Sequence, residues 1–274
     1  MSLKTYFEKN RKRLRKRKRL IAFLSILAVL GLSTATFAWF TVNTFAGIND
    51  FELKISTGDE LRVSMDDHGS DIDQYVFTIT NEMIDSHLRK YNNSLKDMIL
   101  APVTTNNGSD FTYQHGNKAN PNDRDNPSYL EVDCYFIASR EMWVHLTTEA
   151  GDNPAIEESA RVGTKVSSPS PAPQSEITQA IRLDFQTSDD GVKTYEPNKG
   201  SAVTRLSTFD LPSGEMVYSD DNYLFHLDKL TPKKVTFRLW MEGEDPQCDN
   251  DVQNAILRVS LSFVGCDSNN NPIG

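Results

Sequence analysis

Four carboxylates stand close together in an acidic stretch near the C-terminus, between two segments of alternating apolar and polar residues. They are Glu242, Asp245, Asp249 and Asp251. Carboxylate oxygens gathered in an extracellular turn are the ligands that Ca²⁺ prefers. The stretch lacks the EF-hand spacing with its closing Glu. The sequence therefore leaves two interpretations open, a calcium site or a solvated acidic turn. The same two interpretations apply to the Asp-rich run 66–73.

Motifs for catalysis are absent from the chain. The five histidines are scattered, and the H-E-x-x-H, G-x-S-x-G, P-loop and G-x-G-x-x-G patterns do not occur. We therefore predict that the protein is not an enzyme and uses no cofactor, Ca²⁺ apart. A secreted hydrolase remains the catalytic alternative, since a fold can bring His145 or His226 together with acidic neighbours. A metallopeptidase has no motif to support it.

The three cysteines are Cys134, Cys248 and Cys266, too few for a disulfide scaffold. Cys248 and Cys266 are close enough in sequence to pair across a hairpin. The alternative is that they remain free thiols. No C-x-x-C spacing supports a cysteine zinc site.

The elements that must position these residues are predicted to be strands. Alternation of apolar and polar residues predicts hairpins over 51–65, over 129–146 and over 235–264. One apolar face per strand favours an all-β, antiparallel, jelly-roll-like sandwich. Helical spacing predicts one short helical region over 81–100, in one or two pieces. Residues 104–128 and 167–175 are predicted to be long loops.

The N-terminal part has the composition of an export signal. Residues 1–19 form a basic region with ten Lys and Arg against Glu8 alone, and an uncharged apolar run continues through 20–41. The run is long enough to span a bilayer, and the basic flank keeps its N-terminal end in the cytoplasm. Signal peptidase would cut between Ala38 and Trp39; otherwise the segment stays as a membrane anchor. Residues 42–274 are then the extracellular domain.

That domain is strongly acidic. After residue 19 the chain has 19 Lys and Arg against 37 Asp and Glu. A body of this charge does not bind nucleic acid through counterion release. The charge suits solubility outside the cell and the binding of cations at a few places.

Two passages resemble a known group of proteins. The run Thr36-Phe37-Ala38-Trp39-Phe40-Thr41 resembles the leaders that SipW-type signal peptidases process in Gram-positive bacteria. The passage from Leu239 to Cys248, with its W-x-E-G-x-D-x-x-C pattern, is similar to exported proteins of the TasA and camelysin group. The resemblance implies a jelly-roll sandwich at the cell surface or in the biofilm matrix. It also implies that copies of the protein assemble, with residues 39–55 as a donated strand.

Three functions follow as hypotheses. The first is an exported structural protein of the surface or matrix, which assembles with copies of itself. The second is a membrane-anchored extracellular binding module, calcium-dependent if the acidic turns bind Ca²⁺. The third, the secreted hydrolase, lacks motif support.

Overall fold

The computed structural model describes residues 44–273 apart from 57, 59, 115 and 200–205, together with Lys18. Residues 44–274 form one compact unit, separate from residues 1–43. Two mixed β-sheets dominate this unit, and the helices are short. The predicted β-rich fold is therefore confirmed, whereas the expectation of purely antiparallel sheets is wrong.

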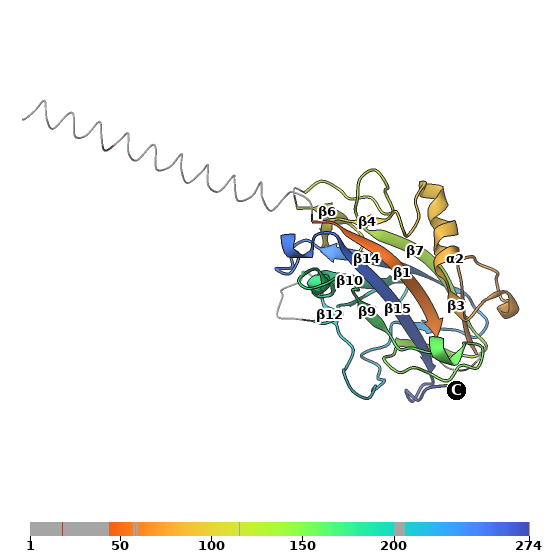
Figure 1. Ribbon diagram of the computed structural model, residues 1–274. Coiled ribbons are helices and arrows are strands. Elements are labelled where there is room, and N and C mark those ends of the chain that lie inside the picture. Colours follow the sequence, from red (N-terminus) through yellow and green to blue (C-terminus); the bar gives the residue numbers. More distant parts are fainter. Residues whose placement is uncertain are drawn as a thin grey trace, which may run out of the picture. The chain divides into compact units, whose positions relative to one another are not determined.

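The first sheet is built around the longest strand of the described chain. Its order is β13 (Phe225–Leu227), β8 (Met142–Leu146), β15 (Ala255–Cys266), β1 (Ala46–Ile55) and β3 (Thr78–Ile79). β4 (Ile99–Leu100) pairs with β1, and β9 (Lys165–Ser167) pairs with β15. β1 and β15 run parallel, and Figure 1 shows them side by side along the face of the molecule. β1 therefore has hydrogen-bonded neighbours on both sides.

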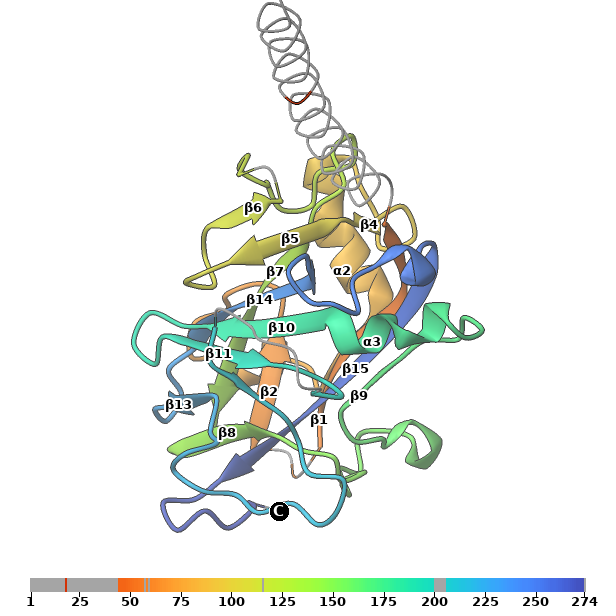
Figure 2. The same cartoon turned by 90° about the vertical axis from the view of Figure 1, so that its left-hand side faces the viewer.

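The second sheet is centred on β14 (Lys233–Glu242). On one side lie β10 (Ile181–Gln186), β11 (Val192–Tyr195) and β12 (Thr208–Phe209), and on the other lie β7 (Leu130–Ala138) and β2 (Leu61–Ser64). β5 (Pro102–Thr105) pairs in parallel with the end of β14 and carries β6 (Phe111–Tyr113). α3 (Ile177–Ala180) leads directly into β10, as Figure 2 shows. The short 3₁₀ turns of the described chain are Ile72–Gln74, Arg89–Tyr91, Glu158–Ala160, Gln174–Glu176 and Asn250–Val252.

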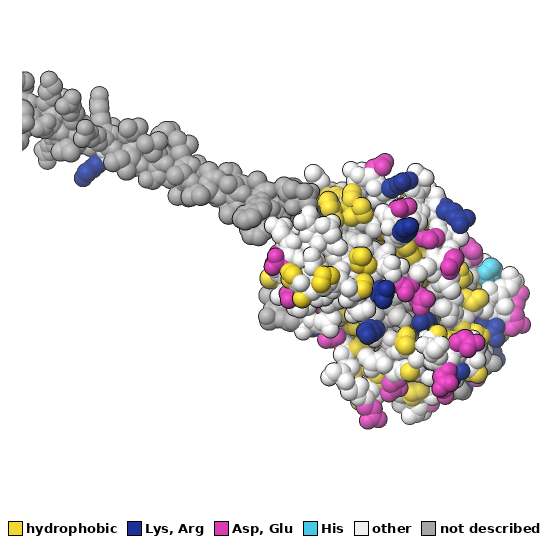
Figure 3. All heavy atoms as spheres, in the orientation of Figure 1, with side chains coloured by type: hydrophobic (Ala, Val, Ile, Leu, Met, Phe, Trp, Pro, Cys, Tyr) yellow, Lys and Arg dark blue, Asp and Glu magenta, His cyan; other side chains and the backbone are white. Residues whose placement is uncertain are grey.

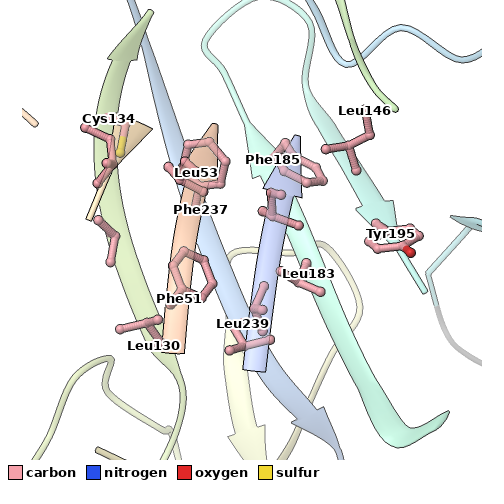
Figure 4. Close-up of a cluster of buried hydrophobic side chains, with 14 of the residues drawn as sticks. Phe51, Leu53, Leu130, Cys134, Leu146, Leu183, Phe185, Tyr195, Phe237 and Leu239 are labelled. Carbon is pink, nitrogen blue, oxygen red and sulfur yellow. The ribbon is translucent and has the colours of Figure 1, made fainter. Parts of the chain in front are cut away.

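The two sheets share one apolar core. Alternate residues of β1, among them Phe51, Leu53 and Ile55, have almost no exposed surface. In Figure 4, Phe51 and Leu53 lie in one cluster with Phe185 of β10 and Phe237 of β14, which belong to the second sheet. Burying each such side chain contributes about 1.5–3 kcal/mol to folding, so the core is the main source of stability. On the face seen in Figure 3, acidic and basic side chains are interspersed.

The three predicted hairpins are not hairpins. β1 and β2, β7 and β8, and β14 and β15 each divide between the two sheets, so their short connections cross from one sheet to the other. Alternation shows that one face of a strand is apolar and buried. It is the same whether the next strand in the chain pairs with it in one sheet or lies in the opposite sheet. Alternation identified the strands but did not identify their partners.

The helical and loop predictions are partly right. α2 (Asn81–Leu88) and the turn Arg89–Tyr91 occupy the first half of the predicted helical region, and the chain leaves the helix at Asn92 with φ 55°. Asn tolerates this left-handed conformation, which commonly ends helices. The predicted loop 104–128 contains the end of β5 and all of β6. Phe111 of β6 is fully buried beneath Tyr129 and Trp240.

Candidate functional site

The passage with the W-x-E-G-x-D-x-x-C pattern ends β14 and enters a buried ionic cluster. Arg182 of β10 lies opposite Trp240 of β14 in the strand register. Its guanidinium Nη2 is 2.6 Å from Asp245 Oδ2 and 2.9 Å from Glu196 Oε1. All three side chains are 1% exposed. A buried Arg with two carboxylates is a structural unit, because removing one partner leaves an uncompensated charge in the interior.

Glu242 is buried next to this cluster. Its Oε2 accepts a hydrogen bond of 3.1 Å from Trp240 Nε1, and its Oε1 accepts one from the Glu244 backbone N–H. Burial raises the pKa of the Glu242 carboxyl. The next residue, Gly243, lies so close to Pro102 that an added Cβ would come within 3.2 Å of the proline ring. Trp240, Glu242 and Gly243 thus join the end of β14 to β5.

The four residues of the expected calcium site do not converge. Asp245 is paired with Arg182, and Glu242 with Trp240. Asp249 Oδ1 accepts from the Asp251 backbone N–H and so caps the turn Asn250–Val252. Among the described residues, these four carboxylates form no group with the spacing of metal ligands. Two of the four carboxylates thus already stabilise the fold, and calcium binding by this passage stays a prediction.

Of the two alternatives for Cys248 and Cys266, a disulfide or free thiols, the structure has the free thiols. All three cysteines are free thiols. Cys248 precedes β15, and Cys266 is its last residue. A strand of this length extends over roughly 35–40 Å, far more than the 4.4–6.8 Å between the Cα atoms of a disulfide. The prediction failed because it assumed a hairpin where the structure has one long strand.

A second ionic group lies on the other part of β10 and β14. Arg238 Nε contacts Glu131 Oε2 at 2.6 Å, and its Nη1 lies 2.8 Å from the Gly108 carbonyl oxygen. Asp184, directly opposite Arg238 in the register, is only 3.5 Å from Nη1 and is fully buried. Burial raises the pKa of Asp184 to about 8, despite the nearby guanidinium. Burial thus favours the protonated form of Asp184.

The group with metal-ligand spacing lies elsewhere, at the edge of the first sheet. Ligand atoms of Glu141, His226 and Asp228 all lie within 4.8 Å of one another. His226 Nε2 is 3.1 Å from Glu141 Oε1, and the imidazole packs on the Trp143 indole with 4.8 Å between ring centroids. Sequence reasoning named His226 only as one of two hydrolase candidates. It missed Glu141 and Asp228, because no local sequence pattern indicates that β13 pairs with β8.

A hollow of about 400 Å³ lies beside Asp228. Its lining comes from the β10–β11 turn and from the segment that leads into β14, and it includes Asp189 and Lys233. Lys233 Nζ is 2.8 Å from both Asp189 and Asp190 carboxylates. The lysine of this lining is thus already paired with two carboxylates.

The other histidine proposed for hydrolysis, His145, bonds to an amide and not to a carboxylate within the described part of the chain. His145 is buried, and its Nδ1 lies 3.0 Å from Asn222 Oδ1. Burial lowers the pKa of this imidazole. The ring also packs edge-on against Tyr218.

The leader residues Ala38 and Trp39 lie outside the described residues, as does the predicted apolar helix. Within the part of the chain that is described, no helix has the length and apolar character needed to cross a membrane. Comparison of the chain with family models, with curated proteins and with solved structures finds no match.

Proposed function

We propose that this protein is an exported structural component of the cell surface or extracellular matrix. In this proposal its leader is of the SipW type and is cut between Ala38 and Trp39. The body is a jelly-roll-like sandwich of the kind found in the TasA and camelysin group. The leader motif and the acidic β-rich unit support the proposal.

One observation carries the assembly part of the proposal. β1, which follows the cleavage region closely in sequence, fills a position between β15 on one side and β3 and β4 on the other. Its core-facing residues Phe51 and Leu53 are fully buried there. The position thus matches β1 in register, hydrogen bonding and side-chain shape. A neighbouring copy that presents the same strand would meet the same complementary position.

Within one copy β1 occupies its own position, so assembly requires an exchange. A copy whose β1 has left would accept the β1 of its neighbour, and repetition of this step would make a chain of subunits. The exchange leaves the number of strand pairings unchanged. A copy that lacks β1 and has received no replacement would instead expose the edge of β15.

The first experiment reads the N-terminal residue of the exported protein by mass spectrometry. We expect Trp39 as the first residue. An exported protein that retains the whole apolar segment would refute the cleavage.

The second experiment tests the exchange itself. A chain beginning at residue 58 is mixed with a peptide of residues 44–56, and recovery of the native circular dichroism spectrum is measured. The matched control peptide carries Leu53→Asp, which places a charge in the core. Sizing and electron microscopy of the 39–274 form, with and without Ca²⁺, then test for polymers. A form that stays monomeric at high concentration, together with a peptide that fails to restore the spectrum, would refute assembly by exchange of β1.

A membrane-anchored extracellular binding module is the second candidate. The hollow lined by Asp228 and Lys233 favours it, because its volume of about 400 Å³ lies in the range of small-molecule binding pockets. This candidate requires that the leader stay uncut, so the N-terminal residue distinguishes the two.

A further inference from the structure

Strand geometry explains why Glu141, His226 and Asp228 meet. β13 and β8 are antiparallel, with His226 opposite Trp143 and Leu227 opposite Met142. The next positions along the two strands are Asp228 and Glu141. Side chains two residues apart on a strand project from the same face. Phe225, Leu227, Met142 and Val144 are buried, so the intervening residues face outward together.

This arrangement places the carboxylates of Glu141 and Asp228 on opposite positions of two paired strands. Like charges directly opposite on paired strands destabilise a sheet. Among the described residues, the one ion pair of Glu141 is with His226, and Asp228 has no ion pair. Arg140 pairs with Glu60 and Lys233 with Asp189 and Asp190, and the exposed Lys229, next to Asp228 in sequence, makes no ion pair among the described residues. Apart from the contact between His226 and Glu141, the described Lys and Arg side chains therefore form no ion pair with these two carboxylates, whereas a divalent metal ion would neutralise both.

The ligand types indicate which metal. Ca²⁺ and Mg²⁺ prefer oxygen ligands alone, whereas an imidazole nitrogen with two carboxylates suits Zn²⁺ and similar ions. Atoms bound to one Zn²⁺ at ~2.0–2.2 Å lie ~3.3–3.6 Å apart in tetrahedral geometry. Ligand atoms within 4.8 Å of one another reach that spacing by small rotations of exposed side chains. The Trp143 indole packs against the imidazole of His226 and restricts its orientation.

We propose that Glu141, His226 and Asp228 form a site for a divalent transition metal of the Zn²⁺ type. The three residues leave a fourth coordination position open to water or to a ligand. The site is independent of leader cleavage and of strand exchange, so it can fail or succeed separately from the proposed function.

The test uses the full-length chain in mild detergent, purified with a tag that contains no histidine and freed of metal with EDTA. Equilibrium dialysis against Zn²⁺ with elemental analysis gives the stoichiometry and the affinity. Thermal unfolding with Zn²⁺ or Ca²⁺ gives the shift in Tm. We expect one Zn²⁺ per chain and a rise in Tm of about 5–10 °C at a hundredfold excess over Kd, with no comparable rise for Ca²⁺.

The variants His226→Ala and Glu141→Gln should each weaken Zn²⁺ binding about tenfold or more. The matched controls are His87→Ala, another partly exposed histidine, and Asp251→Asn, an acid of the calcium candidate. Both should bind as the parent does. Substitution of Co²⁺ for Zn²⁺ should give visible absorption that is lost in His226→Ala. Absence of saturable Zn²⁺ binding, or binding that His226→Ala and Glu141→Gln leave intact, would overturn the proposal.

Discussion

At the scale of single residues, the W-x-E-G-x-D-x-x-C passage is a set of structural contacts. The Trp240 indole donates a hydrogen bond to the Glu242 carboxylate, and Asp245 forms an ion pair with Arg182. Gly243 has no side chain and so allows Pro102 to pack closely against it. Two of the four carboxylates that suggested a calcium site, Glu242 and Asp245, are thus buried, and their partners are an indole and a guanidinium. A motif of acidic residues on a turn indicates metal binding only where the acids have no other partner.

Arg182 should be among the most sensitive residues of the fold. Arg182→Met leaves the buried carboxylates of Glu196 and Asp245 without their cation. We expect a loss of about 3–5 kcal/mol in the free energy of unfolding, measured by urea denaturation. The matched control is Arg258→Met, an exposed strand arginine, which should change stability by less than about 0.5 kcal/mol. Equal effects of the two substitutions would contradict the role assigned to the cluster.

Asp184 should make stability depend on pH. Burial raises its folded-state pKa to about 8, whereas the unfolded value is near 4. Between these values the folded protein binds more protons than the unfolded chain, so this group's contribution to stability falls as pH rises from about 4 to 8. The slope cannot exceed about 1.4 kcal/mol per pH unit.

Asp184→Asn should remove that part of the pH dependence, which denaturation series at pH 5, 6, 7 and 8 would measure. Asp125→Asn, at an exposed position, serves as the control and should leave the dependence unchanged. A parent protein and an Asp184→Asn variant with parallel pH profiles would disprove the assignment.

At the scale of elements, the connection from β8 to β9 within the first sheet depends on one glycine. β9 approaches β15 through residues 163 and 164, where Thr164 Oγ1 exchanges hydrogen bonds with the Ser262 backbone. Gly163 lies directly against the backbone of Thr148, so a side chain there would overlap main-chain atoms. The absence of a Cβ at Gly163 is thus what lets this segment lie directly against the main chain at Thr148.

Gly163→Ala should therefore destabilise the protein by about 1–3 kcal/mol or more, because main-chain atoms cannot rotate away from a new methyl group. Gly214→Ala is the control, since nothing lies within 4 Å of the position its Cβ would take. Thermal unfolding of the two variants side by side measures the difference. Equal melting temperatures would show that the segment at 163 can shift at little cost.

At the scale of the whole molecule, one apolar core joins strands that are far apart in sequence. β1, at the start of the described unit, is completed by β15 at its end. The first and last strands of the unit are therefore neighbours in one sheet. Two of the three thiols lie in the interior of the unit. Cys134 and Cys266 are buried, and burial raises the pKa of Cys266 to about 12.

The folded protein should hence contain three unpaired, slowly reacting thiols. Maleimide labelling without reductant should be slow for the native protein and should reach three adducts after denaturation, as read by intact mass. Burial also raises the pKa of Cys248, so the reactive thiolate is scarce at each position. Labelling of only Cys134 after denaturation would instead demonstrate a Cys248–Cys266 bridge.

The sequence alone was sufficient to locate strands, because period-two alternation reports which face of a strand is buried. The segments that contain β1, β7, β14 and β15 were all found this way. The helix at 81–88 was found through its apolar spacing, although Asn92 ended it early. Phe111 was missed, because one apolar residue among Asn, Asp and Gly gives no periodic signal.

The composition of a segment determines local properties: the charge of the N-terminal region, the apolar run that follows it, and the acidity and strand content of the body. Only the tertiary structure decided which strands pair, since a buried face is satisfied equally well by several partners. That choice separated Cys248 from Cys266 and bonded Asp245 to Arg182. It also placed Glu141 beside His226 and Asp228, because these contacts depend on register between strands distant in the chain.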